Sequence, residues 1–282
     1  MIDAPFVVQR WISPELRAVW WNNIRWPTAL FLLVAAAFAN TSVDVSIART
    51  LFYDAAHHRW IGADSWWTNG LIHTGGQWLL RGLIVAALIL WVWSLQRPSR
   101  KPLRRPTAYF VLASVLSIGI TGLLKTVTNV HCPWALSVFG ANQPYLHLFD
   151  PRPASMRPGH CFPAAHASFG YSLLALYFVF LERRRVIAQA ALALGMGAGL
   201  LFGIAQQSRG AHFLSHDLWS AFLVWLTCLT IYAFVFRASL WSTPPHLLPR
   251  HLPSARIERS WEIATGQPVL AGGHFPEVSN PD

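Results

Sequence analysis

Long apolar segments recur along the chain and are separated by short stretches rich in arginine, histidine and proline. Six of them are long enough to cross a bilayer, at roughly residues 27–45, 78–95, 107–124, 164–181, 187–205 and 217–236. A transmembrane helix needs about 20 mostly apolar residues, because the hydrocarbon core is about 30 Å thick. The pattern therefore predicts an all-α fold, an integral membrane six-helix bundle.

Composition supports this assignment, because 54% of the residues are hydrophobic and only 12% are charged. An ordinary soluble domain of this length carries a larger charged fraction. The alternative is a soluble all-helical bundle with unusually apolar cores.

Positive charge is concentrated in alternate connections between the apolar segments. These cations are Arg10, Arg17 and Arg25; Arg97, Arg100, Lys101, Arg104 and Arg105; Arg183, Arg184 and Arg185; and Arg237, Arg250, Arg256 and Arg259. Short cytoplasmic loops carry the excess of Lys and Arg, so both termini are expected in the cytoplasm, with the protein in a bacterial inner membrane. The net charge of +10 then reflects topology and contact with anionic membrane lipids, and no nucleic-acid partner is expected.

Three regions organise the chain. Residues 1–26 are predicted to form a cytoplasmic interfacial N-terminus, and residues 27–237 the membrane domain. Residues 238–282 lack a sustained apolar period and contain several prolines, which predicts a loose cytoplasmic tail.

The external loop 46–77 contains apolar residues near helical spacing, namely Trp66, Trp67, Leu71 and Trp78. This spacing predicts an interfacial helix that lies on the membrane surface. Upstream, Ala37-Phe38-Ala39 resembles a secretory cleavage site. The long polar lead before it favours a retained anchor instead.

Histidine and cationic side chains gather where two external segments, 125–163 and 206–216, meet the membrane. They are Lys125, His131, His147, Arg152, Arg157, His160, His166, Arg209, His212 and His216, beside Asp150 and Asp217. An ionisable side chain at the edge of a transmembrane bundle is costly, so it is a functional candidate. The cluster indicates phosphate chemistry at the non-cytoplasmic membrane face.

Three motifs in this region resemble the type-2 phosphatidic-acid phosphatase superfamily, which also includes vanadium haloperoxidases. The family pattern is K-x6-R-P, then P-S-G-H, then S-R-x5-H-x3-D, on a six-helix core. Here the matching stretches run from Lys125 to Pro133, from Pro163 to His166 and from Ser208 to Asp217. The resemblance covers roughly residues 107–236 and implies a membrane phosphatase that needs no metal or other cofactor. Its expected substrate is a lipid phosphate or diphosphate.

The resemblance also implies residue roles. His212 is the nucleophile that forms a phosphohistidine, which water then resolves, and His166 is the general acid at the leaving oxygen. Asp217 is expected to orient His212 and to stabilise its charged form. The expected phosphate-binding groups are Lys125, Arg209 and the backbone N–H groups of Ala164 and Ala165 at a helix start.

Several positions depart from the family pattern. Cys132 stands where the family has Arg, and Ala164 and Ala165 replace Ser and Gly. Arg209 lies three residues before His212, where the family has six. That displacement is near one helical turn, so the guanidinium can still reach the same pocket.

Two roles consequently stay open at the sequence level. Asp217 is rotated about 100° from the family position if the segment is helical, which leaves His216 as the alternative partner of His212. The charge missing from the first motif can be supplied by Arg157 or by Arg152.

Two of the three cysteines, Cys132 and Cys161, lie on the external side and next to the first and second motifs. We predict a disulfide between them that holds Lys125 near His166. Two free thiols are the alternative. Cys228 lies in the sixth apolar segment and is expected to be a packing residue.

Other functions use the same residues. A lipid phosphotransferase would need the same site, and a metal-dependent membrane hydrolase would use His212 and His216 with His160 or His166. The nearby cations Lys125 and Arg209 oppose a dication. A non-enzymatic binding or transport protein on this scaffold is the third reading.

Overall fold

The structure is a computed structural model and describes residues 14–153 and 156–236. The predicted tail and residues 1–13 of the predicted N-terminal region lie outside these described residues. The described chain is mostly helical, which confirms the all-α prediction. Its longer helical elements are α1 (Pro14–Ala39), α2 (Val43–Leu51), η1 (Trp67–Gly76), α3 (Gln77–Leu95), α4 (Lys101–Val127), α5 (Ala165–Tyr171), α6 (Leu174–Phe180), α7 (Arg185–Ser208) and α8 (Leu214–Val235).

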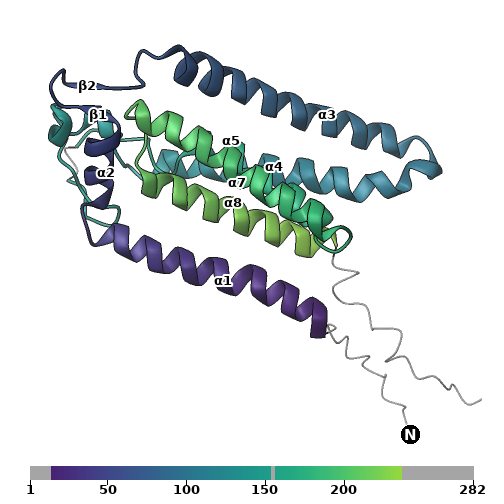
Figure 1. Cartoon of the computed structure of the whole chain (residues 1–282). Coiled ribbons are helices and arrows are strands. Elements are labelled where there is room, and N and C mark those ends of the chain that lie inside the picture. Colours follow the sequence, from purple (N-terminus) through teal and green to yellow (C-terminus); the bar gives the residue numbers. More distant parts are fainter. Residues whose placement is uncertain (1–13, 154–155, 237–282) are drawn as a thin grey trace, which may run out of the picture. The chain divides into compact units, whose positions relative to one another are not determined.

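Short elements complete the described chain. Strands β1 (Tyr53–Asp54) and β2 (Arg59–Trp60) form an antiparallel pair. Three 3-10 turns, η2 (Pro98–Arg100), η3 (Pro133–Ala135) and η4 (Ser137–Phe139), lie in the connections. Figure 1 shows the long helices side by side, with α2 and the strands gathered at one end of them.

Four continuous helices in the described residues are long and apolar enough to cross a membrane, namely Trp67–Leu95, Pro98–Val127, Arg185–Ser208 and Leu214–Val235. A fifth candidate is the pair Trp21–Ala39 and Val43–Leu51, which is bent by 81°. The apolar helix over Ala165–Phe180 is shorter. These helices are consistent with an integral membrane protein, and the count of six complete spans stays a prediction.

The N-terminal helix differs from its predicted boundaries. Helix α1 joins part of the predicted interfacial region and the first predicted span, and it ends at Ala39 rather than near residue 45. Two polar side chains end it, because Asn40 and Thr41 donate hydrogen bonds of 2.7 Å to the carbonyls of Ala36 and Ala37. Side-chain bonds of this kind satisfy carbonyls that have lost their helical partners. The chain then turns into α2.

The predicted surface helix is instead part of a helix that is long and apolar enough to cross a membrane. The π-helical segment η1 continues directly into α3, so Trp67–Leu95 is one continuous helix. The four apolar residues that suggested a surface helix all stay exposed, namely Trp66, Trp67, Leu71 and Trp78. At the junction, Gly76 leaves room for the ring of Phe202 on α7, which a Cβ would overlap. The apolar periodicity was therefore real, but this close contact with α7 directs the segment along the bundle.

A row of glycines on α7 brings three helices close to it. A Cβ at Gly195, Gly199 or Gly203 would overlap Leu174, Tyr171 or the Asp217 carboxyl group, respectively. Small residues spaced one turn apart let membrane helices approach at backbone distance. The row therefore fixes α5, α6 and the start of α8 against α7.

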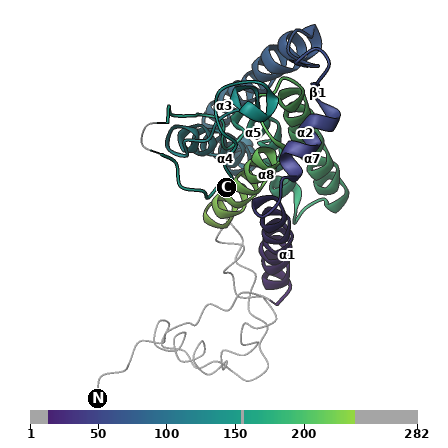
Figure 2. The ribbon, with the colours of Figure 1, turned by 90° about the vertical axis from the view of Figure 1, so that its left-hand side faces the viewer.

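Figure 2 views the bundle from the end that carries α2 and the strands. A small apolar cluster closes this end. Its buried members are Ala48, Trp60, Leu136, Phe139 and Phe213. Trp60 covers Gly210, whose φ of 71° suits a residue without a side chain. The backbone N–H of Gly62 donates to the Ser208 carbonyl at 2.9 Å. These contacts fix the connection between α7 and α8.

Replacing Gly199 by alanine is expected to destabilise the protein, because the new methyl group must displace the buried ring of Tyr171. Overpacking of this kind costs about 1–3 kcal/mol. The measurement is thermal unfolding of the purified protein in detergent. Gly197→Ala is the matched control, since nothing lies within 4 Å of a Cβ there. Equal unfolding temperatures for the two variants would contradict this packing.

Candidate active site

The three motif segments meet at one place, where α4 ends and where α5 and α8 begin. A parallel bridge pairs Val130 with His160, and the Cys161 N–H donates to the Val130 carbonyl at 2.9 Å. The Gly159 N–H donates to the Asn129 side chain at 2.7 Å. The second half of the first motif is thus hydrogen-bonded to the segment that leads into the second motif.

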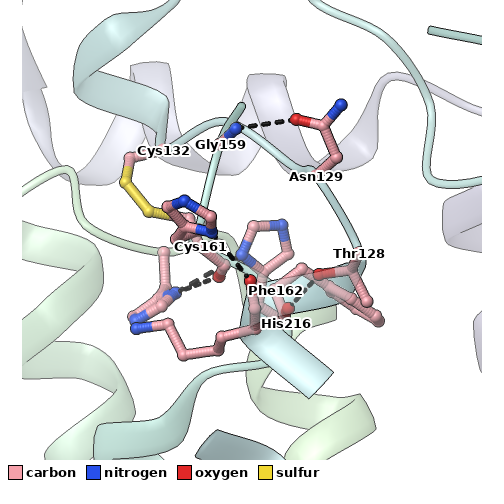
Figure 3. The surroundings of a disulfide bond; sticks show 10 residues. Thr128, Asn129, Cys132, Gly159, Cys161, Phe162 and His216 are labelled. Carbon is pink, nitrogen blue, oxygen red and sulfur yellow. Dashed lines mark hydrogen bonds between the residues drawn. A yellow bond between two sulfur atoms is a disulfide. The ribbon is translucent and has the colours of Figure 1, made fainter. Parts of the chain in front are cut away.

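A disulfide between Cys132 and Cys161 joins the same two segments, which confirms the predicted pairing (Figure 3). Their Cα atoms are 5.1 Å apart, within the usual range for a disulfide. The bond fixes the backbone at Cys161 relative to α4, which ends five residues before Cys132. The carbonyl group of Cys161 is therefore held in place.

That carbonyl group orients the imidazole of His212. Its oxygen lies 2.7 Å from Nδ1 of His212. A carbonyl oxygen can only accept a hydrogen bond, so Nδ1 carries the proton and donates it. In the neutral imidazole, Nε2 then keeps a free lone pair. The backbone has selected the tautomer that a nucleophilic histidine requires.

His212 is buried, with 3% of its surface exposed. Burial lowers the pKa of its imidazole well below the usual 6.5, and the neighbouring His216, Lys125 and His166 act in the same direction. The ring is therefore neutral at neutral pH. These electrostatic interactions also show that Lys125, His166 and His212, which belong to three different motifs, lie in one site.

Asp217 has a different partner from the one expected. Its carboxylate accepts a hydrogen bond of 2.5 Å from Nε2 of Gln207 on α7, and its Oδ1 has no partner among the described residues. The absence of a side chain at Gly203 makes room for it. The expected Asp217–His212 hydrogen bond is thus not formed, because α8 turns this carboxylate toward α7.

His216, the alternative partner, does lie beside His212. Their Nδ1 atoms are 3.4 Å apart, and both rings are buried. His216 also links the second motif to α8, since its carbonyl oxygen accepts from the Ala164 N–H at 3.3 Å. The Ala164 N–H, expected to bind phosphate, is therefore used within the protein. Ala165 is the first residue of α5, so its N–H has no hydrogen-bond acceptor within the helix.

Lys125 and Arg209 supply positive charge that no carboxylate neutralises. Both ion pairs found in the described part of the chain involve Asp54, which lies outside the site. Arg209 donates to the Gln206 side chain at 3.0 Å, which orients the guanidinium without cancelling its charge. These cations are available to an anionic ligand.

His166 has a neighbour that the motifs did not indicate. Its ring stacks on that of His73, with centroids 4.1 Å apart and an angle of 26° between the rings. His73 belongs to η1, so the segment assigned above to a surface helix contributes to the site. Arg209 acts electrostatically on both imidazoles.

With this geometry in hand, comparison with protein families gives one match. Residues 106–240 match the family model of the PAP2 superfamily, and all three motifs lie inside the matched range. Over this segment the chain resembles the PAP2 superfamily. Comparisons with curated proteins and with solved structures gave no match. Because PAP2 members are phosphatases, the match supports a phosphoric ester hydrolase.

The departures from the PAP2 pattern have structural counterparts. Cys132, in place of the family arginine, forms the disulfide. Arg152 donates to carbonyl groups of its own loop, including those of Leu148 and Asp150, and Arg157 is exposed. Neither appears among the groups that act on His212 in the described residues. The structure therefore gives no support to a direct replacement of the missing charge.

The metal-dependent alternative lacks a suitable set of donors in the described ranges. No group of three or more His, Cys, Asp or Glu residues there is arranged to hold a metal ion. His212 and His216, the proposed ligand pair, bring their Nδ1 atoms together, and that of His212 is already bonded to Cys161.

The motifs include neither His73 nor Arg81, which acts electrostatically on His166, and both residues lie outside the PAP2 match. A signal was present, because His73, Gln77 and Arg81 are polar residues spaced four apart in an otherwise apolar stretch. Such a row on a helix predicts a polar stripe. Assigning residues 46–77 to a surface helix separated His73 from the apolar segment that begins at residue 78.

Removing the disulfide is expected to lower both stability and turnover. Its two cysteines are 29 residues apart, and a loop of that size is worth roughly 3–4 kcal/mol in the chain-entropy model. Turnover should fall because the Cys161 carbonyl is no longer held against His212. The measurements are thermal unfolding and kcat of the Cys132→Ser/Cys161→Ser double variant.

The control is Cys228→Ala, which removes a buried thiol inside the bundle. Wild-type and Cys228→Ala proteins should both lose turnover in a reductant. A double variant with wild-type kcat would show that the disulfide does not position His212.

Proposed function

We propose that this protein is a membrane phosphatase that hydrolyses a lipid phosphate or diphosphate through a phosphohistidine on His212. The observation that carries the proposal is the hydrogen bond from Nδ1 of His212 to the Cys161 carbonyl. It leaves Nε2 as a free nucleophile next to Lys125 and His166, in a segment of the PAP2 superfamily.

In the first step, Nε2 of His212 attacks phosphorus and the bond from phosphorus to the lipid oxygen breaks. The bound phosphate anion favours protonated His166, which donates its proton to the departing oxygen. Negative charge spreads over the three remaining phosphoryl oxygens in the transition state, where fixed cations stabilise it. Lys125 and Arg209 supply that charge, and neither has to be released from a carboxylate first.

In the second step, water attacks phosphorus and the bond to Nε2 of His212 breaks, which releases inorganic phosphate. His166, now neutral, accepts a proton from the attacking water. Throughout, the Cys161 carbonyl keeps its hydrogen bond to Nδ1 and stabilises positive charge on the phosphorylated ring. A backbone carbonyl dipole thus takes the part that a carboxylate plays in a catalytic triad.

The membrane setting favours a lipid substrate. The site lies at the ends of helices that are long and apolar enough to cross a bilayer. A lipid can keep its chains in the bilayer while its headgroup enters the pocket. The distribution of Lys and Arg along the chain favours the external face for this reaction.

Replacing either histidine should abolish turnover. His212→Ala and His166→Ala are expected to lower kcat by roughly 10³-fold or more, because each removes a group that the chemical step uses. Lys125→Ala should raise KM by roughly tenfold, since it removes a charge that binds phosphate. The measurement is phosphate release by the purified protein from a panel of lipid phosphates. His57→Ala is the control, because His57 is exposed and pairs with Asp54 outside the site.

The same assay separates the alternatives. The proposed chemistry should persist in a chelator and be inhibited by vanadate. Activity lost in chelator and restored by zinc would favour a metal-dependent hydrolase, and transfer of phosphate to an added alcohol would favour a phosphotransferase. Release of phosphate from no substrate in the panel would favour a binding or transport role. Near wild-type turnover in either histidine variant would refute its assigned role.

The buried site also predicts the pH dependence. Because burial lowers the pKa of His212 well below 6.5, the neutral nucleophile persists on acidification. The acid limb of kcat/KM reports the free enzyme, so it should lie below pH 6.5 after correction for ionisation of the substrate. An acid limb at or above pH 6.5 could also come from ionisation of the substrate. Such a limb would disappear with a substrate analogue whose phosphate has a lower pKa, and the nucleophile assignment would then stand. A limb that stays at or above pH 6.5 after this correction would contradict the assignment of His212 as the nucleophile.

A further inference from the structure

Positive charge around His166 exceeds what the three motifs provide. The groups that act electrostatically on this imidazole are His73, Lys125, Arg209 and Arg81, and no carboxylate is among them. Lys125 and Arg209 belong to the motifs. His73 and Arg81 come from η1 and α3, which lie outside the PAP2 match.

Arg81 stands at an exposed position of a helix that is long and apolar enough to cross a membrane. A charged side chain there is costly and indicates a function. Its guanidinium carbon is 5.4 Å from the ring centre of Phe169, which is three residues after His166 and so on the same side of α5. Gln77 accepts a hydrogen bond of 2.8 Å from Arg81. Arg81 is therefore held against α5, one helical turn from His166.

His73 lies eight residues before Arg81 on the same continuous helix. Its ring is stacked on His166 and is partly exposed. His73, Gln77 and Arg81 follow one another at intervals of four residues. The row thus extends the polar lining of the pocket along η1, and Arg81 adds positive charge at the start of α3.

We propose that His73 and Arg81 form a second phosphate-binding subsite next to His166, which takes the second phosphate group of a lipid diphosphate. This inference rests on the proposed function and narrows its substrate class. The terminal phosphate lies at His212, and the phosphate that remains on the lipid lies at His73 and Arg81.

Charge balance supports a diphosphate. A phosphate monoester carries about −1.5 to −2 at neutral pH, which Lys125 and Arg209 already match. A diphosphate adds a further ionised phosphate group. Arg81 supplies the matching positive charge, and a neutral His73 can donate a ring N–H to a phosphate oxygen. Arginine also offers paired N–H donors that fit two phosphate oxygens at once.

The test compares two substrates with the same acyl chains, diacylglycerol diphosphate and phosphatidic acid, in mixed micelles with the full-length protein. Arg81→Gln should lower the ratio of kcat/KM for the diphosphate to that for the monophosphate by at least about tenfold. Arg81→Lys, which keeps the charge, should recover part of the ratio. His73→Gln should lower the ratio in the same direction.

The matched control is Arg100→Gln. Arg100 lies 3.5 Å from the centre of the Trp93 ring and donates to Gln96 at 3.3 Å, so its surroundings resemble those of Arg81 with Trp78 and Gln77. It lies beyond the other end of α3. The Arg100→Gln variant should have the wild-type ratio of kcat/KM for the diphosphate to kcat/KM for the monophosphate. An unchanged ratio in Arg81→Gln, or an equal drop in Arg100→Gln, would overturn the subsite.

A binding measurement keeps this inference separate from turnover. Inorganic diphosphate should raise the unfolding temperature of the wild-type protein more than inorganic phosphate does, and Arg81→Gln should lose that difference. Protein that releases no phosphate but keeps this difference would refute the proposed function and support the subsite. Protein that releases phosphate but is stabilised equally by diphosphate and phosphate would support the proposed function and refute the subsite.

Discussion

The hydrogen bond between Nδ1 of His212 and the Cys161 carbonyl is the constraint on which the site depends. A buried imidazole can serve as a nucleophile only if one nitrogen is held protonated and the other is left free. A backbone oxygen meets this need without a second buried charge, which would be expensive to keep at the end of a membrane bundle. The disulfide and the bridge between Val130 and His160 keep that oxygen where His212 can reach it.

The rest of the fold brings His212 to this oxygen. The glycine row on α7 fixes the start of α8, and the apolar cluster around Trp60 fixes the connection that carries His212. Asp44 of α2 accepts a hydrogen bond of 3.0 Å from the Ser215 N–H, at the first turn of α8. A carboxylate at a helix N-terminus is favourable because it faces unpaired N–H groups. The position of His212 thus depends on contacts from segments that are far apart in the chain.

The electrostatic character of the pocket follows from what surrounds His166. Cations from α3, α4 and the α7–α8 connection act on it, and the carboxylate of Asp217 is turned away toward Gln207. An arrangement of this kind is costly in an empty site, since like charges repel. Binding of an anion relieves that repulsion. The segregation of Asp217 from the cations is therefore consistent with a site built for phosphate groups.

The sequence by itself determined the apolar helices, the order and spacing of the three motifs, and the two cysteines that pair. These features depend on local composition and on neighbours along the chain, which hydropathy and residue type record directly. Lys125, His166, Arg209 and His212 could be chosen for that reason. The resemblance to a phosphatase family followed from the same letters.

Only the tertiary structure decided which groups touch. The partner of His212 is a backbone carbonyl, and every residue has one, so no letter marks Cys161 for that role. The partner of Asp217 depends on the rotation of α8, which Gly203 and Gln207 set from a different helix. His73 reaches His166 because η1 continues into α3 beside α7, although its apolar pattern fitted a surface helix equally well. Contacts between segments far apart in the chain depend on the packing of whole helices, and that packing is the sum of many small contacts that no local pattern encodes.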